Sequence, residues 1–147
     1  ELSVTMNNRY SIVKLYLRIV GTAGIVAFPC GLLPASWMDA THRWLGMGAL
    51  PTEPIVGYLA RSTSFFYALL GGLLWLLSSD VARFRPIILF VGWTMIIMGM
   101  MVLSMDYLEG MPWWWVMIEG PSDALLGVIM VCLAKRISPV KPSLLTD

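Results

Sequence analysis

The sequence predicts an all-α, polytopic membrane protein with four transmembrane helices and a short amphipathic helix in the first outer loop. Two observations carry this prediction: a composition poor in charge, and four apolar stretches of spanning length. Of the 147 residues, 58% are hydrophobic and only 13% are charged, whereas an average soluble domain has about 25% charged residues. Too few charged side chains remain to cover a soluble fold of this size. A net charge of +1 also argues against a nucleic-acid partner.

Four stretches are long enough to cross a hydrocarbon core of about 30 Å, which takes roughly 20 apolar residues in a helix. The first stretch could instead be a signal peptide, but its apolar run is longer than the core of such a peptide and no cleavage site follows cleanly. We therefore expect one four-helix domain over 1–147, with a cytoplasmic tail at 135–147. The expected spans are 11–33, 55–78, 86–105 and 113–134.

A short amphipathic helix is expected at 36–46, between the first two spans. Ser36 can cap its start, and Asp39 stands three positions later, where a carboxylate can reach back to the backbone. Trp37 and Trp44 fall on one face, as in a helix that lies in the membrane interface. Such a helix either covers the outer edge of the bundle, which we favour, or forms a lid over a lipid-soluble ligand. The glycines expected to end it are Gly46 and Gly48.

Basic residues indicate the orientation of the chain. Eight of the ten Lys and Arg residues fall on one side of the four-span layout, and this bias marks the cytoplasmic side. Both termini are therefore predicted to be cytoplasmic, with the first and third loops outside. The eight residues are Arg9, Lys14, Arg18, Arg83, Arg85, Lys135, Arg136 and Lys141.

Tryptophans stand where an aromatic belt at the membrane interface is expected. Three of them follow one another before the last span and point in different directions around a helix. At least one of the three therefore faces protein or a neighbouring chain. The predicted interface anchors are Trp37, Trp44, Trp113, Trp114 and Trp115.

Small residues recur at every fourth position of the second span. This spacing lets two helix backbones approach closely, and the partner is a helix of the same chain or of another subunit. The predicted packing face consists of Ala60, Ser64, Ala68 and Gly72.

Three charged residues lie at membrane depth, where each costs roughly 3 kcal/mol and needs a partner or a cavity. At about 1.5 Å per residue, Asp123 lies roughly 16 Å from the inner end of its span and Glu119 roughly 22 Å. Arg61 lies roughly 25 Å from the inner end of the second span. Arg61 and Glu119 match in depth, so we predict that they pair. Tyr67 and Ser64 are the expected hydrogen-bond partners of Asp123.

The last span has two interpretations. In the first, its helix is continuous from Trp113, and Glu119 and Asp123 line a buried polar site one turn apart. In the second, Gly120-Pro121 breaks the helix, the preceding residues lie in the interface, and Asp123 caps a shorter span.

No arrangement of residues indicates catalysis, a metal or a cofactor, and we expect that the chain is not an enzyme. The single histidine, His42, is expected to face solvent from the interfacial helix. Cys30 and Cys132 are expected on opposite sides of the membrane, too far apart for a disulfide. Three methionines share a face of the third span without His or Cys beside them, which favours apolar packing over Cu(I) binding. They are Met98, Met101 and Met105.

Several segments resemble those of small bacterial four-helix membrane proteins, and the span layout is loosely similar to the DoxX-like group. The resemblance implies a bacterial inner membrane and the company of respiratory or redox enzymes. The segments are 57–64, 66–72, 110–114 and 119–121.

Two functions are therefore in competition. The first is a non-catalytic accessory subunit that stabilises or links a larger respiratory, photosynthetic or other redox complex through contacts with lipids and other membrane subunits. The alternative is a small protein that binds or transports a quinone, a lipid or a proton through Arg61, Glu119 and Asp123. A membrane enzyme acting on lipid is a weaker third hypothesis.

Overall fold

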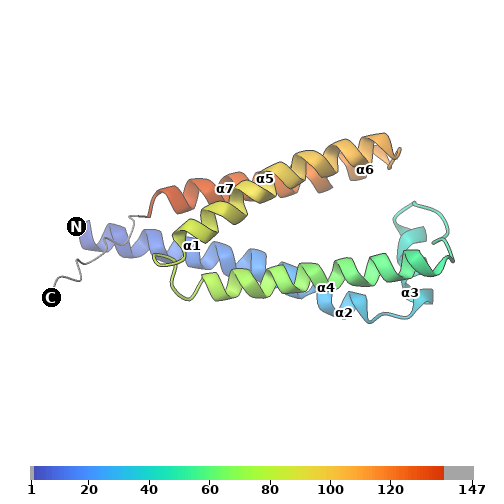
Figure 1. Ribbon diagram of the computed structural model, residues 1–147, viewed down its shortest axis with the longest axis horizontal. Coiled ribbons are helices and arrows are strands. Elements are labelled where there is room, and N and C mark those ends of the chain that lie inside the picture. Colours follow the sequence, from blue (N-terminus) through green and yellow to red (C-terminus); the bar gives the residue numbers. More distant parts are fainter. Residues whose placement is uncertain (1, 138–147) are drawn as a thin grey trace. The chain divides into compact units, whose positions relative to one another are not determined.

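The computed structural model describes residues 2–137 and is all-helical over that range. Residues 138–147 of the expected tail lie outside the described residues. Figure 1 shows the order of the helices along the chain. The helices are α1 (Leu2–Ile25), α2 (Ala27–Gly31), α3 (Ala35–Trp44), α4 (Pro54–Leu77), α5 (Arg85–Leu108), α6 (Trp113–Val116) and α7 (Glu119–Lys135).

Four helical stretches are long and apolar enough to cross a membrane, which confirms the predicted four-span, all-α architecture. The third span continues to Leu108, three residues beyond its predicted end, and the chain then turns at Gly110, whose φ is +69°. This left-handed conformation favours glycine and stops the helix. The observed spans are Asn8–Gly31, Pro54–Leu77, Arg85–Leu108 and Trp113–Lys135.

The first span is interrupted between α1 and α2. α1 ends at Ile25 and α2 begins at Ala27. Pro29 follows closely and has no backbone N–H, so it cannot donate the usual helical bond to the carbonyl of Ile25. The interruption therefore has a local cause in the sequence.

The interfacial helix forms as predicted, but its start differs from the expectation. Pro34 is the N-terminal flanking residue of α3, and no side chain caps the helix. Ser36 therefore lies inside the first turn and does not cap it. The end is as expected: Gly46 follows the last turn with φ +77°.

The described part of the chain forms two compact units, one made of residues 2–17 and 77–137 and the other of residues 18–76. We call them the α5–α7 unit and the α3–α4 unit. In the α3–α4 unit, α1 and α4 approach closely at glycines. A Cβ added at Gly24 would lie 2.8 Å from the carbonyl oxygen of Tyr67, and one at Gly71 would collide with the backbone of Gly21.

The close approach of α4 to α1 therefore uses Gly71 rather than its neighbour Gly72. A Cβ added at Gly72 would meet nothing within 4 Å in the described part of the chain. Ala60, Ser64 and Ala68 of the predicted packing face are half-buried, whereas Gly72 is exposed.

In the α5–α7 unit, α5 and α7 run antiparallel and side by side (Figure 1). A Cβ added at Gly99 would lie 2.6 Å from the carbonyl oxygen of Gly120, and one at Gly127 would lie 2.6 Å from that of Gly92. Each helix thus places a glycine at the contact twice, seven residues apart, the spacing of a helix pair that stays in contact over several turns. Arg85, seven residues before Gly92, donates from Nε to the carbonyl oxygen of Ala134 at 3.0 Å.

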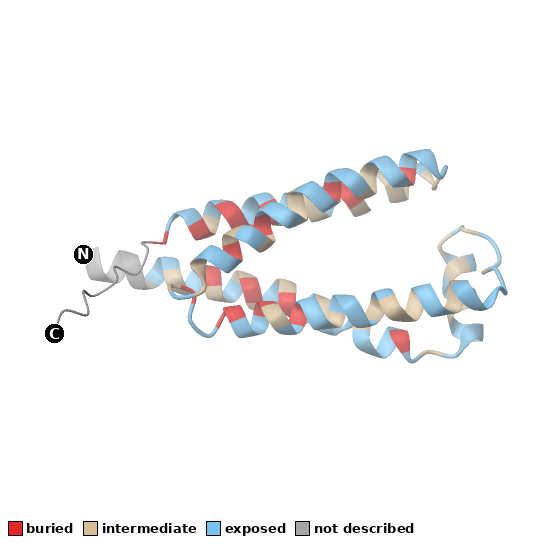
Figure 2. Ribbon diagram, viewed as in Figure 1, coloured by how far each residue is buried: buried red, intermediate tan, exposed pale blue. Residues whose placement is uncertain are grey.

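The buried side chains of this unit gather towards the start of α5 and the end of α7 (Figure 2). The N-terminal part of α1 contributes to the same core, and the hydroxyl of Tyr16 donates to the carbonyl oxygen of Leu126 at 2.6 Å. The buried apolar residues of the unit are Val13, Leu17, Leu77, Val81, Ile88, Met130, Val131, Ala134 and Ile137.

The last span is neither continuous from Trp113 nor broken at Gly120-Pro121. A turn at residues 117–118 separates α6 from α7. Pro121 stands in the first turn of α7, where its missing N–H has no helical partner to lose. Asp123 lies in the following turn and is therefore not a capping residue.

Candidate functional site

A carboxyl group that the sequence reading did not single out is buried at the far end of α5. Asp106 continues the seven-residue series of Arg85, Gly92 and Gly99, so it lies on the face of α5 that meets α7. It is 9% exposed. Its Oδ2 atom is fully buried and has no hydrogen-bond partner among the described residues. The glycine repeat was the signal in the sequence that could have identified it.

Glu119 is the first residue of α7 and is half-buried. Its carboxylate accepts a hydrogen bond from the indole N–H of Trp115 in α6, so this bond joins the two helices across the intervening turn. Asp123 stands four residues after Glu119 on α7, and Asp106 lies on the face of α5 that meets this helix. We call these three residues the carboxylate cluster.

Asp123 is half-buried on α7. Its carboxylate makes no hydrogen bond and no ion pair within residues 2–137. The hydroxyl of Ser64, one of its predicted partners, donates instead to the carbonyl oxygen of Ala60 at 3.0 Å. Tyr67 belongs to the α3–α4 unit as well, and its bond to Asp123 stays a prediction.

A carboxylate pair or triad at membrane depth is costly, because like charges repel and the surrounding medium is apolar. Burial of such groups is normally compensated by a cation, a hydrogen-bond donor or a proton. In the described part of the chain, one indole N–H is the only donor to the cluster. No group of three or more His, Cys, Asp or Glu residues there is arranged to hold a metal ion.

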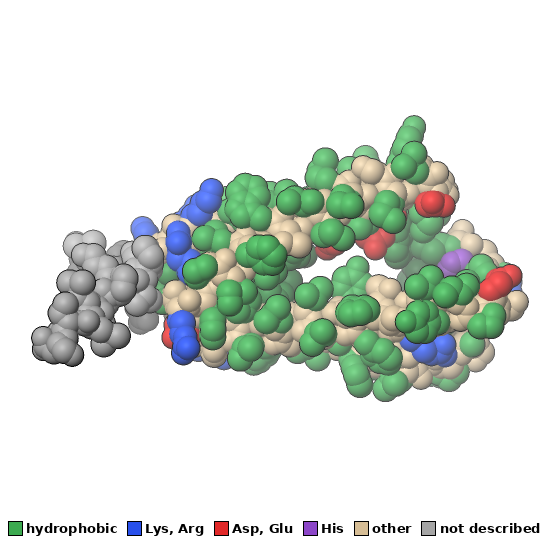
Figure 3. Space-filling view, viewed as in Figure 1, with side chains coloured by type: hydrophobic (Ala, Val, Ile, Leu, Met, Phe, Trp, Pro, Cys, Tyr) green, Lys and Arg blue, Asp and Glu red, His purple; other side chains and the backbone are tan. Residues whose placement is uncertain are grey.

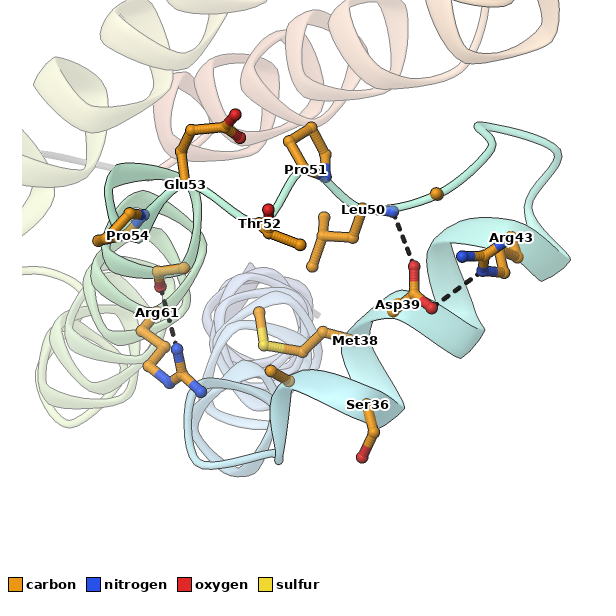
Figure 4. Close-up of a pocket in the computed structure, with 13 residues that line it drawn as sticks. Ser36, Met38, Asp39, Arg43, Leu50, Pro51, Thr52, Glu53, Pro54 and Arg61 are labelled. Carbon is orange, nitrogen blue, oxygen red and sulfur yellow. Dashed lines mark hydrogen bonds and ion pairs between the residues drawn. The ribbon is translucent and has the colours of Figure 1, made fainter.

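The second candidate site is a cavity of about 530 Å³ in the α3–α4 unit (Figure 4). Its walls come from α3, from the loop that joins α3 to α4, and from the first turns of α4. Its volume falls in the range of small-molecule pockets. The lining includes Met38, Leu50, Pro51 and Pro54, with the charged residues Asp39, Arg43, Glu53 and Arg61.

Asp39 fixes the loop of this cavity to α3. Its Oδ2 atom pairs with Nε of Arg43 at 2.9 Å, and its Oδ1 atom accepts the backbone N–H of Leu50 at 2.8 Å. The hydrogen bond from Arg43, with that from Leu50, lowers the pKa of Asp39 below its ordinary value. Asp39 and Arg43 therefore compensate each other's charge.

Arg61 is the cation of the cavity without such a partner. Its guanidinium donates to two backbone carbonyl oxygens, Gly57 at 3.4 Å and Leu33 at 3.2 Å. No carboxylate within the described residues lies in ion-pair contact with it. Arg61 and Glu119 each have their observed partners within their own unit, and the pairing of the two stays a prediction.

The predicted interface anchors differ in exposure. Trp37, Trp44 and Trp113 are largely exposed. Trp114 and Trp115 are half-buried, and their rings meet edge to face with centroids 5.5 Å apart. Trp115 faces protein, since its indole bonds Glu119.

The remaining residues considered for chemistry have ordinary environments. Nδ1 of His42 lies 2.9 Å from the carbonyl oxygen of Gly48, so the ring helps to close the turn after α3. Cys30 and Cys132 are free thiols. The three methionines predicted to share a face of the third span are exposed on α5: Met98, Met101 and Met105.

Comparisons with protein-family models, curated proteins and solved structures found no match to this chain. The four long, apolar helices by themselves define the class of the chain, a multi-pass, all-α membrane protein.

Proposed function

We propose that the chain is a non-catalytic accessory subunit of a larger complex in the inner membrane of a bacterium. The observation that carries this proposal is the carboxylate cluster of the α5–α7 unit. Asp106 is buried without a partner for Oδ2, and Asp123 is half-buried without a hydrogen bond, in the part of the chain described. A donor from a neighbouring subunit would reach and compensate Asp123, because part of this side chain stays exposed.

The surface around the cluster supports a protein partner. Tyr107, Leu108 and Trp113 are each more than three-quarters exposed and lie at the same end of the unit. Aromatic side chains are enriched at protein interfaces. A respiratory, photosynthetic or other redox complex is the expected assembly, as the resemblance of the span layout suggests.

The proposed orientation has both termini in the cytoplasm. In the α5–α7 unit, Lys and Arg side chains gather at one end and acidic side chains lie towards the end that carries α6 (Figure 3). The excess of basic residues supports the cytoplasmic assignment of the first end. Lys135 at that end also lies 5.5 Å from the ring of Trp93, as expected of an interfacial anchor.

Purification from the native membrane in a mild detergent tests the accessory role. We expect a complex larger than one chain, and we expect Asp123→Asn to lower recovery of the partner at least tenfold by weakening a charge-assisted contact. Glu109→Gln is the matched control, because this exposed carboxylate lies in the loop just after α5. Recovery of the unaltered protein only as a monodisperse monomer would overturn the proposal.

Thiol labelling tests the orientation. With Cys30 and Cys132 replaced by Ala, Ser36→Cys should react in intact cells with a membrane-impermeant maleimide, whereas Ser79→Cys should react only after the cells are broken. The reverse pattern would place the termini outside.

A further inference from the structure

The cavity of the α3–α4 unit contains a cation whose charge is not compensated within the described residues. A guanidinium has five N–H donors, and the bonds of Arg61 to the carbonyl oxygens of Gly57 and Leu33 are long for hydrogen bonds. Backbone carbonyls carry no net charge, so these bonds leave the positive charge in place. Arg61 is thus prepared to bind an anion.

The other charges of the cavity do not supply that anion. Asp39 already pairs with Arg43 and accepts the N–H of Leu50. Glu53 precedes α4, and Figure 4 shows its carboxylate turned away from the Arg61 guanidinium. Arg61 also stands eight residues after Glu53, which at about 1.5 Å per residue is roughly 12 Å along the helix axis of α4.

The place of the cavity in the fold indicates what kind of anion could reach it. Arg61 lies two turns inside a span, at about 10 Å from its first residue, and a long arginine side chain carries its charge back towards the interface. Beside it runs α3, with Trp37 and Trp44 exposed, and tryptophan favours the headgroup level. The lining of the cavity combines its charged residues with apolar ones such as Met38 and Leu50.

The geometry points to a binding site for the phosphate of an anionic membrane phospholipid, with Arg61 as the residue that binds the phosphate. Arginine matches phosphate oxygens with two parallel N–H donors. This site is independent of the accessory role proposed above, because it lies in the other unit and uses none of the carboxylate cluster.

The experiment uses the full chain in nanodiscs and measures lipid retention by native mass spectrometry. We expect one phosphatidylglycerol to be retained at least tenfold better than phosphatidylcholine. Arg61→Gln should abolish this preference. Arg18→Gln is the matched control, an arginine of the same unit that lies over the Trp75 ring, away from the cavity, and it should keep the preference.

A second variant separates loss of the site from loss of the fold. A Cβ added at Gly57 would lie 3.0 Å from Nη1 of Arg61. Gly57→Ala therefore displaces the guanidinium while it keeps the charge and favours the helix. We expect a several-fold weaker retention of phosphatidylglycerol with unchanged thermal stability.

Three results would overturn the assignment. Equal retention of phosphatidylglycerol and phosphatidylcholine would show that Arg61 extends to the headgroup region without selecting an anionic lipid. Displacement of the lipid by submillimolar inorganic phosphate would show a site for a soluble anion. An unchanged preference in Arg61→Gln would show that another group binds the lipid.

Discussion

In the α5–α7 unit the two long helices meet at two levels, with a glycine of each helix at both, and three carboxylates lie towards the end of this unit that carries α6. In the α3–α4 unit α1 and α4 meet around Gly21, Gly24 and Gly71, and Arg61 forms no ion pair among the described residues. Both units use glycine to bring backbones together, yet their candidate sites are built around opposite charges. The comparison indicates what each candidate site lacks within the described residues. The carboxylate cluster of the α5–α7 unit lacks hydrogen-bond donors, and Arg61 of the α3–α4 unit lacks an anion.

The largest effect is expected from filling the glycine contact of the α5–α7 unit. Gly99→Ala places a Cβ 2.6 Å from backbone atoms of Gly120 and Ala124, and overpacking of this kind costs about 3 kcal/mol. Thermal unfolding in detergent measures the loss. Gly72→Ala in the other unit is the control and should be neutral or stabilising by up to about 1 kcal/mol. Equal effects of the two variants would show that the contact does not hold α5 and α7 together.

The second effect concerns the buried carboxylate at the end of the same contact. Asp106→Asn keeps the shape and removes the charge that lacks a partner, so the isolated chain should gain about 1 kcal/mol or more. Glu109→Gln should change stability by less than about 0.5 kcal/mol. A destabilised isolated chain would mean that Asp106 has a stabilising partner within the chain.

Sequence reasoning predicted the spans and the interfacial helix well, because twenty-residue apolar runs and helical periodicity are strong local signals. It missed Asp106, because the third span was predicted to end at Met105 and Asp106 was counted as the first residue of the following loop. It also placed the close approach of α4 at Gly72 rather than Gly71. Spacing fixes a helical face only to within one residue, and the neighbouring helix decides which small residue is used.

The candidate sites were predictable only in part. Arg61, Glu119 and Asp123 were identified by their depth, which depends on the chain alone. Their neighbours depend on features that depth does not report: Trp115, the partner of Glu119, stands four residues before it across a turn at residues 117–118 that was not predicted. The bond from Leu50 to Asp39 likewise joins residues that no local pattern connects.

The third effect is a pH dependence in the loop of the α3–α4 unit. The hydrogen bond from Arg43, together with that from Leu50, lowers the pKa of Asp39 below 3.8. A depressed folded-state pKa means that the stabilisation is complete above the ordinary pKa and is lost as the pH falls through the lower folded-state value. Fluorescence of Trp37 and Trp44 in detergent should therefore change below about pH 4.

Asp39→Asn is the control for that transition. It removes the titrating group, so the fluorescence should lose its acid transition and resemble the low-pH form at neutral pH. A transition that persists in Asp39→Asn would assign it to another carboxyl group, and the loop would not depend on the Asp39 bonds.

The smallest effects compare one hydrogen bond in each unit. Tyr16→Phe removes the bond of 2.6 Å to Leu126, and Thr22→Val removes the acceptor 3.1 Å from the indole N–H of Trp75. Each should lower stability by about 1 kcal/mol, as for a typical hydrogen bond. Tyr16 bonds a residue far away in the sequence within the more buried core, so its loss should be the larger of the two. A larger loss of stability in Thr22→Val than in Tyr16→Phe would contradict this order. It would show that the contact of α1 with α4 depends more on its hydrogen bond than the contact of α1 with α7 does.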